Sequence, residues 1–188
     1  AQTIVTLDRL SQGRLVVGFG SGGAPQEFST FGEADDARQR AEKLDEGLLV
    51  LDRLLRGESL DHQGAHYTLK NVTLNPLPVR QPRPPFWIGG GSPPALRRAA
   101  CWDGWVFPAN EMDGSMAFSP EQIAAKVEVI QSERRAASQN HARAVGPVPG
   151  EPAPFDVAIS GCSEPGQADL PAAYAAAGEW LGSGVFRR

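Results

Sequence analysis

The sequence lacks an excess of basic residues, because its 18 Lys and Arg are outnumbered by 22 Asp and Glu, which leaves a formal net charge of −4. Proteins that bind nucleic acid or an anionic membrane surface carry clustered Lys and Arg. No apolar run approaches the roughly 20 residues of a membrane span, and the first residues lack the basic and apolar regions of a signal peptide. We therefore expect a cytoplasmic protein whose partners are small molecules, with neither nucleic acid nor a membrane among them.

The sequence also has few residues suited to metal, disulfide or nucleophile chemistry. Cys101 and Cys162 lie far apart and form no C-x-x-C pattern, so neither a disulfide framework nor a zinc site is expected. His62 and His66 have no third ligand at metal spacing. No Ser-His-Asp set and no carboxylate pair emerges, so we assign no catalytic residue and no metal site. This absence agrees with a mechanism in which a bound cofactor does the chemistry.

Glycine and proline are by contrast frequent, at 21 and 16 of 188 residues, and they separate segments with strand and helix patterns. The repeated strand–helix order predicts a single domain over residues 1–188, with an α/β fold and parallel strands. An insertion at about 58–85 has the pattern of a hairpin followed by a proline-rich stretch. Strands are expected at 14–19, 86–89, 104–107 and 155–159, and helices at 4–10, 37–55, 93–101, 119–130 and 170–177.

The first glycine cluster follows the first expected strand. Gly18-x-Gly20-x-x-Gly23 fits a dinucleotide fingerprint, but that fingerprint needs a helix that begins inside the motif and an acidic residue at the end of a second strand. Here we expect a long loop with Pro25, and then a helix. Two alternatives stay open, namely that these glycines only turn the chain, and that they approach a cofactor.

The second glycine cluster is Gly89-Gly90-Gly91-Ser92, between an expected strand and a helix whose first residue is Pro93. Unhindered N–H groups and a hydroxyl at this place can bind a phosphate. An equally simple interpretation is that Ser92 only caps the helix. Arg97 and Arg98 could add positive charge, although solvated arginines are the commoner outcome.

A set of motifs in a fixed order resembles the bacterial luciferase-like family of flavin- and deazaflavin-dependent oxidoreductases. The hallmark segment is Leu7 to Gly22, and a weaker likeness continues beyond residue 107 as far as Ala177. The remaining motifs are Glu27-Phe28, Phe31-Gly32, Glu46-Gly47-Leu48, Gly64-x-His66-Tyr67, Gln81 to Pro85, Trp87 to Ser92 and Asp103-Gly104-Trp105.

The resemblance implies part of a (β/α)₈ (TIM) barrel, about strands 4 to 8, and a cofactor that is FMN or coenzyme F420. It implies that Gly20, Ser21 and Gly22 end a barrel strand against the flavin, and that Gly89, Gly90, Gly91 and Ser92 bind its phosphate. FMN members of the family are monooxygenases that use O₂, and F420 members transfer hydride. Trp105 is either a cofactor neighbour or a core residue. Glu27 is either functional or paired with an arginine.

Two departures from the family keep a second hypothesis open. The first three strands of the family have no counterpart before Ala1, and the segment from Glu179 to Arg188 departs from the last barrel strand. Open strand edges expose unpaired backbone groups, which another chain can cover. We therefore consider a homodimer. The alternative to an oxidoreductase is therefore a non-catalytic remnant that acts through oligomerisation, and a nicotinamide dehydrogenase is a third interpretation.

Overall fold

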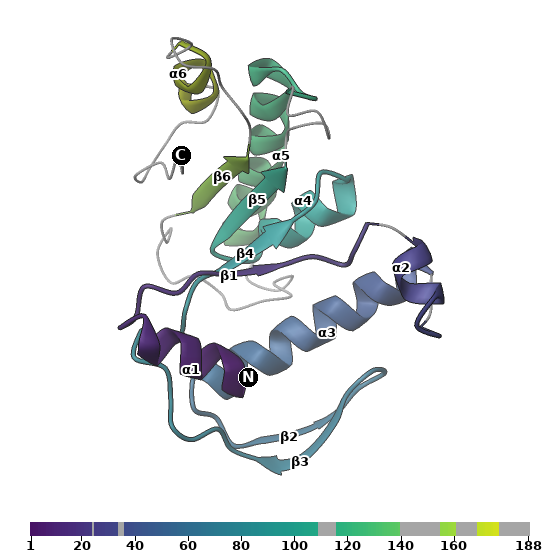
Figure 1. Ribbon diagram of the computed structural model, residues 1–188, viewed down its shortest axis with the longest axis vertical. Coiled ribbons are helices and arrows are strands. Elements are labelled where there is room, and N and C mark those ends of the chain that lie inside the picture. Colours follow the sequence, from purple (N-terminus) through teal and green to yellow (C-terminus); the bar gives the residue numbers. More distant parts are fainter. Residues whose placement is uncertain (24, 34–35, 109–115, 140–154, 161–168, 177–188) are drawn as a thin grey trace. The chain divides into compact units, whose positions relative to one another are not determined.

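The computed structural model describes residues 1–23, 25–33, 36–108, 116–139, 155–160 and 169–176 (Figure 1). The chain divides into two compact units, Ala1–Pro85 and Phe86–Arg188. Among the described residues, no helix has both the length and the apolar character needed to cross a membrane.

Unit 1, in its described residues, consists of three helices, a short strand between the first two, and a two-stranded hairpin after the third. Its elements are α1 (Gln2–Leu10), β1 (Val17–Phe19), α2 (Pro25–Ser29), α3 (Ala37–Leu55), β2 (Leu60–Gln63) and β3 (Thr68–Val72). The side chain of Asp36 caps α3 by accepting the N–H of Arg38 at 2.9 Å, and Gly57 follows its C-terminus with a φ of +88°, as expected for a helix stop. β2 and β3 pair antiparallel, which confirms the predicted hairpin.

Two buried aspartates tie distant segments of unit 1 together. Asp8, on α1, is fully buried, and its Oδ2 accepts the N–H groups of Val79 at 2.6 Å and Arg80 at 3.0 Å. Asp52, on α3, pairs with Arg83. The proline-rich stretch after the hairpin is therefore fixed to α1 and to α3 by hydrogen bonds to carboxylate groups.

Unit 2 is a parallel β/α arrangement. Its elements are β4 (Phe86–Gly89), α4 (Pro93–Ala99), β5 (Gly104–Pro108), α5 (Pro120–Gln139), β6 (Asp156–Ser160) and α6 (Asp169–Ala176). β5 lies between β4 and β6 and pairs parallel with both, with Trp105 opposite Ile88 on one side and Val157 on the other. Figure 1 shows α4 and α5 beside these strands.

The core of unit 2 forms where the apolar strands meet the buried sides of α4 and α5. Phe86, Ile88 and Trp105 are completely buried, together with Ile123 and Ile130 of α5. Asp103 aligns the strand starts, because its Oδ2 accepts the N–H of Phe86 at 2.7 Å and its carbonyl oxygen accepts the N–H of Asp156 at 3.1 Å. The predicted α/β fold with parallel strands is thus confirmed.

Two local expectations were wrong. The strand expected at 14–19 is limited to Val17–Phe19, because Gly13 has a φ of +78° and Arg14 donates back to the carbonyl of Ser11 at 2.8 Å. The expected loop around Pro25 contains the short helix α2, whose first residue is proline, a favoured residue there.

Candidate functional site

The glycine turn, Gly89 to Ser92, connects β4 to α4 within unit 2. Gly90 has a φ of +113°, a conformation that side chains other than glycine rarely adopt. A Cβ on Gly91 would lie 2.5 Å from the Phe107 ring. Backbone conformation and packing therefore explain the glycines at 90 and 91, so an argument for an anion must come from the polar groups of the turn.

Two carbonyl oxygens of the glycine turn, those of Gly90 and Gly91, accept hydrogen bonds from side chains of other elements. The indole Nε1 of Trp105, on β5, donates to the carbonyl of Gly90 at 2.8 Å. The ammonium of Lys126, on α5, donates to the carbonyl of Gly91 at 3.1 Å. Lys126 also lies against two aromatic rings, 5.5 Å from the centroid of Phe107 and 5.3 Å from that of Phe118.

The glycine turn also carries hydrogen-bond donors. Within the described residues the Ser92 hydroxyl makes no capping hydrogen bond, and Ser92 is exposed. Because Pro93 and Pro94 carry no N–H group, the donors near Ser92 are the N–H groups of the turn itself, the N–H of Ala95 in α4 and the Ser92 hydroxyl. A phosphate needs several convergent donors of this kind.

A cavity of about 390 Å³ opens beside the glycine turn on the Lys126 side. Gly91 borders it together with the apolar residues Pro93, Leu96, Phe118, Ala125 and Val129 and the polar residues Gln122 and Lys126. Sequence reasoning missed Lys126. The visible pattern of α5 is its apolar side, and nothing in the sequence connects Lys126 to a turn 35 residues earlier.

The other predicted site segment, Gly20 to Gly22, lies in unit 1 and is held by α2 and α3. The Nε of Arg40 donates to the carbonyl of Ser21 at 3.1 Å. A Cβ on Gly22, whose φ is +79°, would collide with the ring of Phe28, and the Arg40 guanidinium lies 4.3 Å from the centroid of that ring. Thus Ser21 and Gly22 are fixed by specific neighbours, whereas a Cβ on Gly20 would meet no described atom within 4 Å.

The two predicted site segments belong to different units. Gly20, Ser21 and Gly22 lie in unit 1, and Gly89 to Ser92 lie in unit 2. Trp105 is a core residue with no exposed surface, so of its two interpretations the core one is correct. Glu27 lies on α2 and is exposed, and so is Arg97 on α4. The predicted helix at the C-terminus corresponds to α6, but 177–188 lies outside the described residues.

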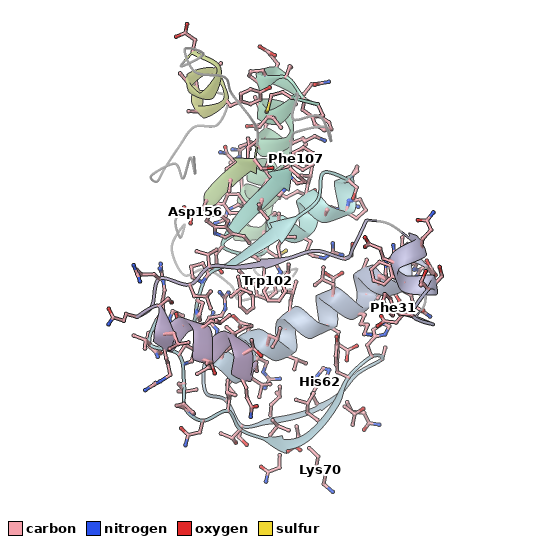
Figure 2. All side chains as sticks on the ribbon, viewed as in Figure 1. Phe31, His62, Lys70, Trp102, Phe107 and Asp156 are labelled. Carbon is pink, nitrogen blue, oxygen red and sulfur yellow. The ribbon has the colours of Figure 1, made fainter. Side chains whose placement is uncertain are left out.

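The two histidines of the insertion, His62 and His66, both form hydrogen bonds with Glu46. In Figure 2, His62 lies between the hairpin and α3, with its Nε2 2.9 Å from Oε1 of Glu46. The same carboxylate accepts the N–H groups of His66 and Tyr67, both at 2.9 Å. In the described part of the chain, no group of three or more metal-ligating side chains occurs.

Glu46 has a strongly shifted pKa. Partial removal from water acts to raise the pKa of Glu46, but hydrogen bonds from His62 and from the N–H groups of His66 and Tyr67 outweigh it and lower the pKa to about 2. The carboxylate is thus ionised at neutral pH and clamps the hairpin to α3, which is a structural role.

The dinucleotide interpretation does not fit unit 1. β1 ends at Phe19, and the residues some 20 positions beyond the glycines belong to helix α3 rather than to the end of a second strand. The acidic residue that would bind a ribose therefore has no strand to present it.

The chain matches one family model and is similar in fold to several solved structures. The family model described as luciferase-like monooxygenase matches residues 1–158. The monooxygenase RslO1 from Streptomyces bottropensis is 26% identical with a TM-score of 0.61, over 82% of this chain and 42% of that protein. An F420-dependent secondary alcohol dehydrogenase, in complex with an F420–acetone adduct, is 20% identical with a TM-score of 0.64, over 84% of this chain and 42% of that protein. DmoA from Hyphomicrobium sulfonivorans is 18% identical with a TM-score of 0.60, over 84% of this chain and 35% of that protein. The chain therefore spans less than half the length of these proteins.

Proposed function

The chain belongs to the luciferase-like monooxygenase family, and we propose that it provides the cofactor-binding part of an oxidoreductase that uses FMN or coenzyme F420 on a small organic substrate. The observation that carries the proposal is the glycine turn. Its Gly90 and Gly91 carbonyl oxygens are held by Trp105 and Lys126, and its N–H groups and the Ser92 hydroxyl are donors of the kind that phosphate accepts.

The two glycine segments have different roles in this proposal. Gly89, Gly90, Gly91 and Ser92 bind the phosphate. Gly20, Ser21 and Gly22 lie against the ring system, where the absence of side chains permits close approach. The bound cofactor supplies the redox chemistry, and the chain's own residues bind and orient it.

Two similar solved structures support this choice of cofactor. One is the F420-dependent alcohol dehydrogenase, and another is a riboflavin lyase in complex with a modified FMN. Both cofactors carry a phosphate beside a flavin-type ring, so one glycine turn suits either. The single domain over 1–188, the homodimer and the cytoplasmic location stay predictions.

The test is a fluorescence titration of the purified full chain with FMN and, separately, with coenzyme F420. We expect saturable binding of one of them with a dissociation constant below about 1 mM, which corresponds to about 4 kcal/mol. A folded chain that binds neither cofactor would contradict the proposal. That outcome would favour the non-catalytic alternative, which an oligomer measured by light scattering would then support.

A further inference from the structure

We infer that Trp105 and Lys126 are positioning residues for the cofactor phosphate, because they fix the directions of the N–H groups in the glycine turn. This inference rests on the proposed function, and it assigns a role in binding to two residues that do not themselves need to touch the cofactor.

The geometry follows from the peptide bond. In a planar trans peptide, the carbonyl of one residue and the N–H of the next point in opposite directions. Trp105 holds the Gly90 carbonyl, so it directs the Gly91 N–H away from β5. Lys126 holds the Gly91 carbonyl, so it directs the Ser92 N–H away from α5. Two consecutive N–H groups are thereby oriented before any anion arrives.

Trp105 is a rigid donor. Its side chain is completely buried and stacks on Phe107, with ring centroids 5.1 Å apart and an interplanar angle of 15°. The ring has little freedom to follow a moving carbonyl, so the carbonyl must stay with the ring. A donor fixed in this way lowers the entropy that the turn loses when it binds a ligand.

Lys126 is restrained as well, because its ammonium lies against the rings of Phe107 and Phe118, and its neighbour Val127 is buried in the core. The two donors come from a strand and a helix. Each peptide of the turn is therefore held by a different element, and a rotation of either peptide breaks one hydrogen bond.

A second tryptophan on the adjacent strand shows that a buried indole can lack a partner in this sheet. The Nε1 of Trp87 is buried and has no hydrogen-bond partner in the described part of the chain. Trp87 therefore offers a matched control for the loss of an indole N–H that makes no hydrogen bond.

The test compares the affinities of the full chain for FMN and for riboflavin, which lacks the phosphate, in wild type and in Trp105→Phe. The variant keeps an aromatic ring, loses the N–H donor and leaves the charge unchanged. We expect FMN affinity to fall about tenfold, because the Gly91 N–H is no longer held in the direction of the phosphate, while riboflavin affinity changes less than about twofold. Trp87→Phe, which removes an indole N–H without a partner, should keep the wild-type ratio.

Lys126→Met and Lys126→Arg form a second series, which is decisive if Trp105→Phe does not fold. Measurements at about 1 M salt, where the screening length is about 3 Å, reduce the through-space attraction of the ammonium. We expect Lys126→Met to lose FMN preference under these conditions and Lys126→Arg, which keeps a donor, to regain most of it.

The outcomes separate the inference from the proposed function. A wild-type chain that binds FMN no more tightly than riboflavin would overturn the phosphate assignment itself. A wild-type preference for FMN that survives unchanged in the folded variants Trp105→Phe and Lys126→Met would leave the phosphate assignment standing and overturn the positioning role.

Discussion

Arg83 and Asp52 form an ion pair inside unit 1, with Nε and Oδ1 2.5 Å apart and side chains only 3% and 7% exposed. Replacing Arg83 by Met should destabilise the chain, because the Asp52 carboxylate would remain buried with fewer donors. Loss of one partner of a buried pair costs about 3–5 kcal/mol. We expect the free energy of unfolding in urea to fall by about 3 kcal/mol, the lower end of this range, because Arg56 still donates to Asp52 at 2.9 Å.

The control for this prediction is the surface pair of Arg53 and Glu58, whose side chains are 47% and 43% exposed. Glu58→Ala should change the free energy of unfolding by less than about 1 kcal/mol, as exposed pairs do. Similar losses of unfolding free energy in Arg83→Met and Glu58→Ala would show that the buried pair stabilises the chain no more than the exposed pair does.

The lowered pKa of Glu46 predicts a specific dependence of stability on pH. A carboxylate whose pKa is depressed on folding stabilises the native state above its unfolded pKa, and this contribution is lost as the pH falls through the folded value. Because the folded pKa is about 2, the melting temperature should fall between about pH 4.5 and pH 2. Glu46→Gln should melt lower at neutral pH and fall less steeply on acidification.

Glu42→Gln is the matched control, because Glu42 lies on the same helix but forms an exposed pair with Arg38. Its pH profile should follow that of wild type. Parallel profiles for Glu46→Gln and wild type would refute the assignment of this acid transition to Glu46.

Gly104 is predicted to be required for strand packing in unit 2. A Cβ there would lie 2.5 Å from Cδ1 of Trp87 and 2.8 Å from the carbonyl oxygen of Asp156, and the backbone oxygen has little room to shift. Gly104→Ala should therefore cost about 1–3 kcal/mol, the usual range for overpacking. Gly18→Ala, where a Cβ meets no described atom within 4 Å, should cost less, as judged by chemical denaturation.

Gly90→Val should weaken FMN binding by about 1–3 kcal/mol, because it disturbs N–H groups that face an anion. The φ of +113° and a Cβ contact at 3.0 Å to Ala95 both oppose a side chain at Gly90. Riboflavin should be affected much less, as measured by equilibrium dialysis. Gly32→Val tests the same backbone strain away from the turn, since Gly32 has a φ of +72° and open space. An equal loss of affinity for FMN and riboflavin would show that the glycine turn does not bind the phosphate.

The elements that sequence reasoning predicted are those with local signals. Asp36 and Gly57 mark the ends of α3, and Ser119 with Gln122 forms a capping box at α5, with the two reciprocal hydrogen bonds at 2.8 and 3.4 Å. Such contacts span only a few residues, so the sequence encodes them directly. The helix α2 was missed because five residues are too few for an apolar period to appear.

The site residues that sequence reasoning did not find are placed by tertiary packing. Both glycine segments were visible from composition and order, but the side chains that hold their carbonyls were not. Arg40 reaches Ser21 across 19 positions, and Lys126 reaches Gly91 across 35. In each case a long, flexible cation on a helix could equally have pointed to solvent, and the packing of that helix decides the outcome.

The central claim is that the two glycine segments bind a flavin-type cofactor, and a residue-resolved binding map tests it most directly. In the amide NMR spectrum of the labelled full chain titrated with FMN, we predict the largest shifts at Gly20, Ser21 and Gly22 and at Gly89 to Ser92. With riboflavin, the shifts at Gly89 to Ser92 should be much smaller, because the phosphate is absent. Saturable FMN binding that leaves the amides of both segments unshifted would contradict the account.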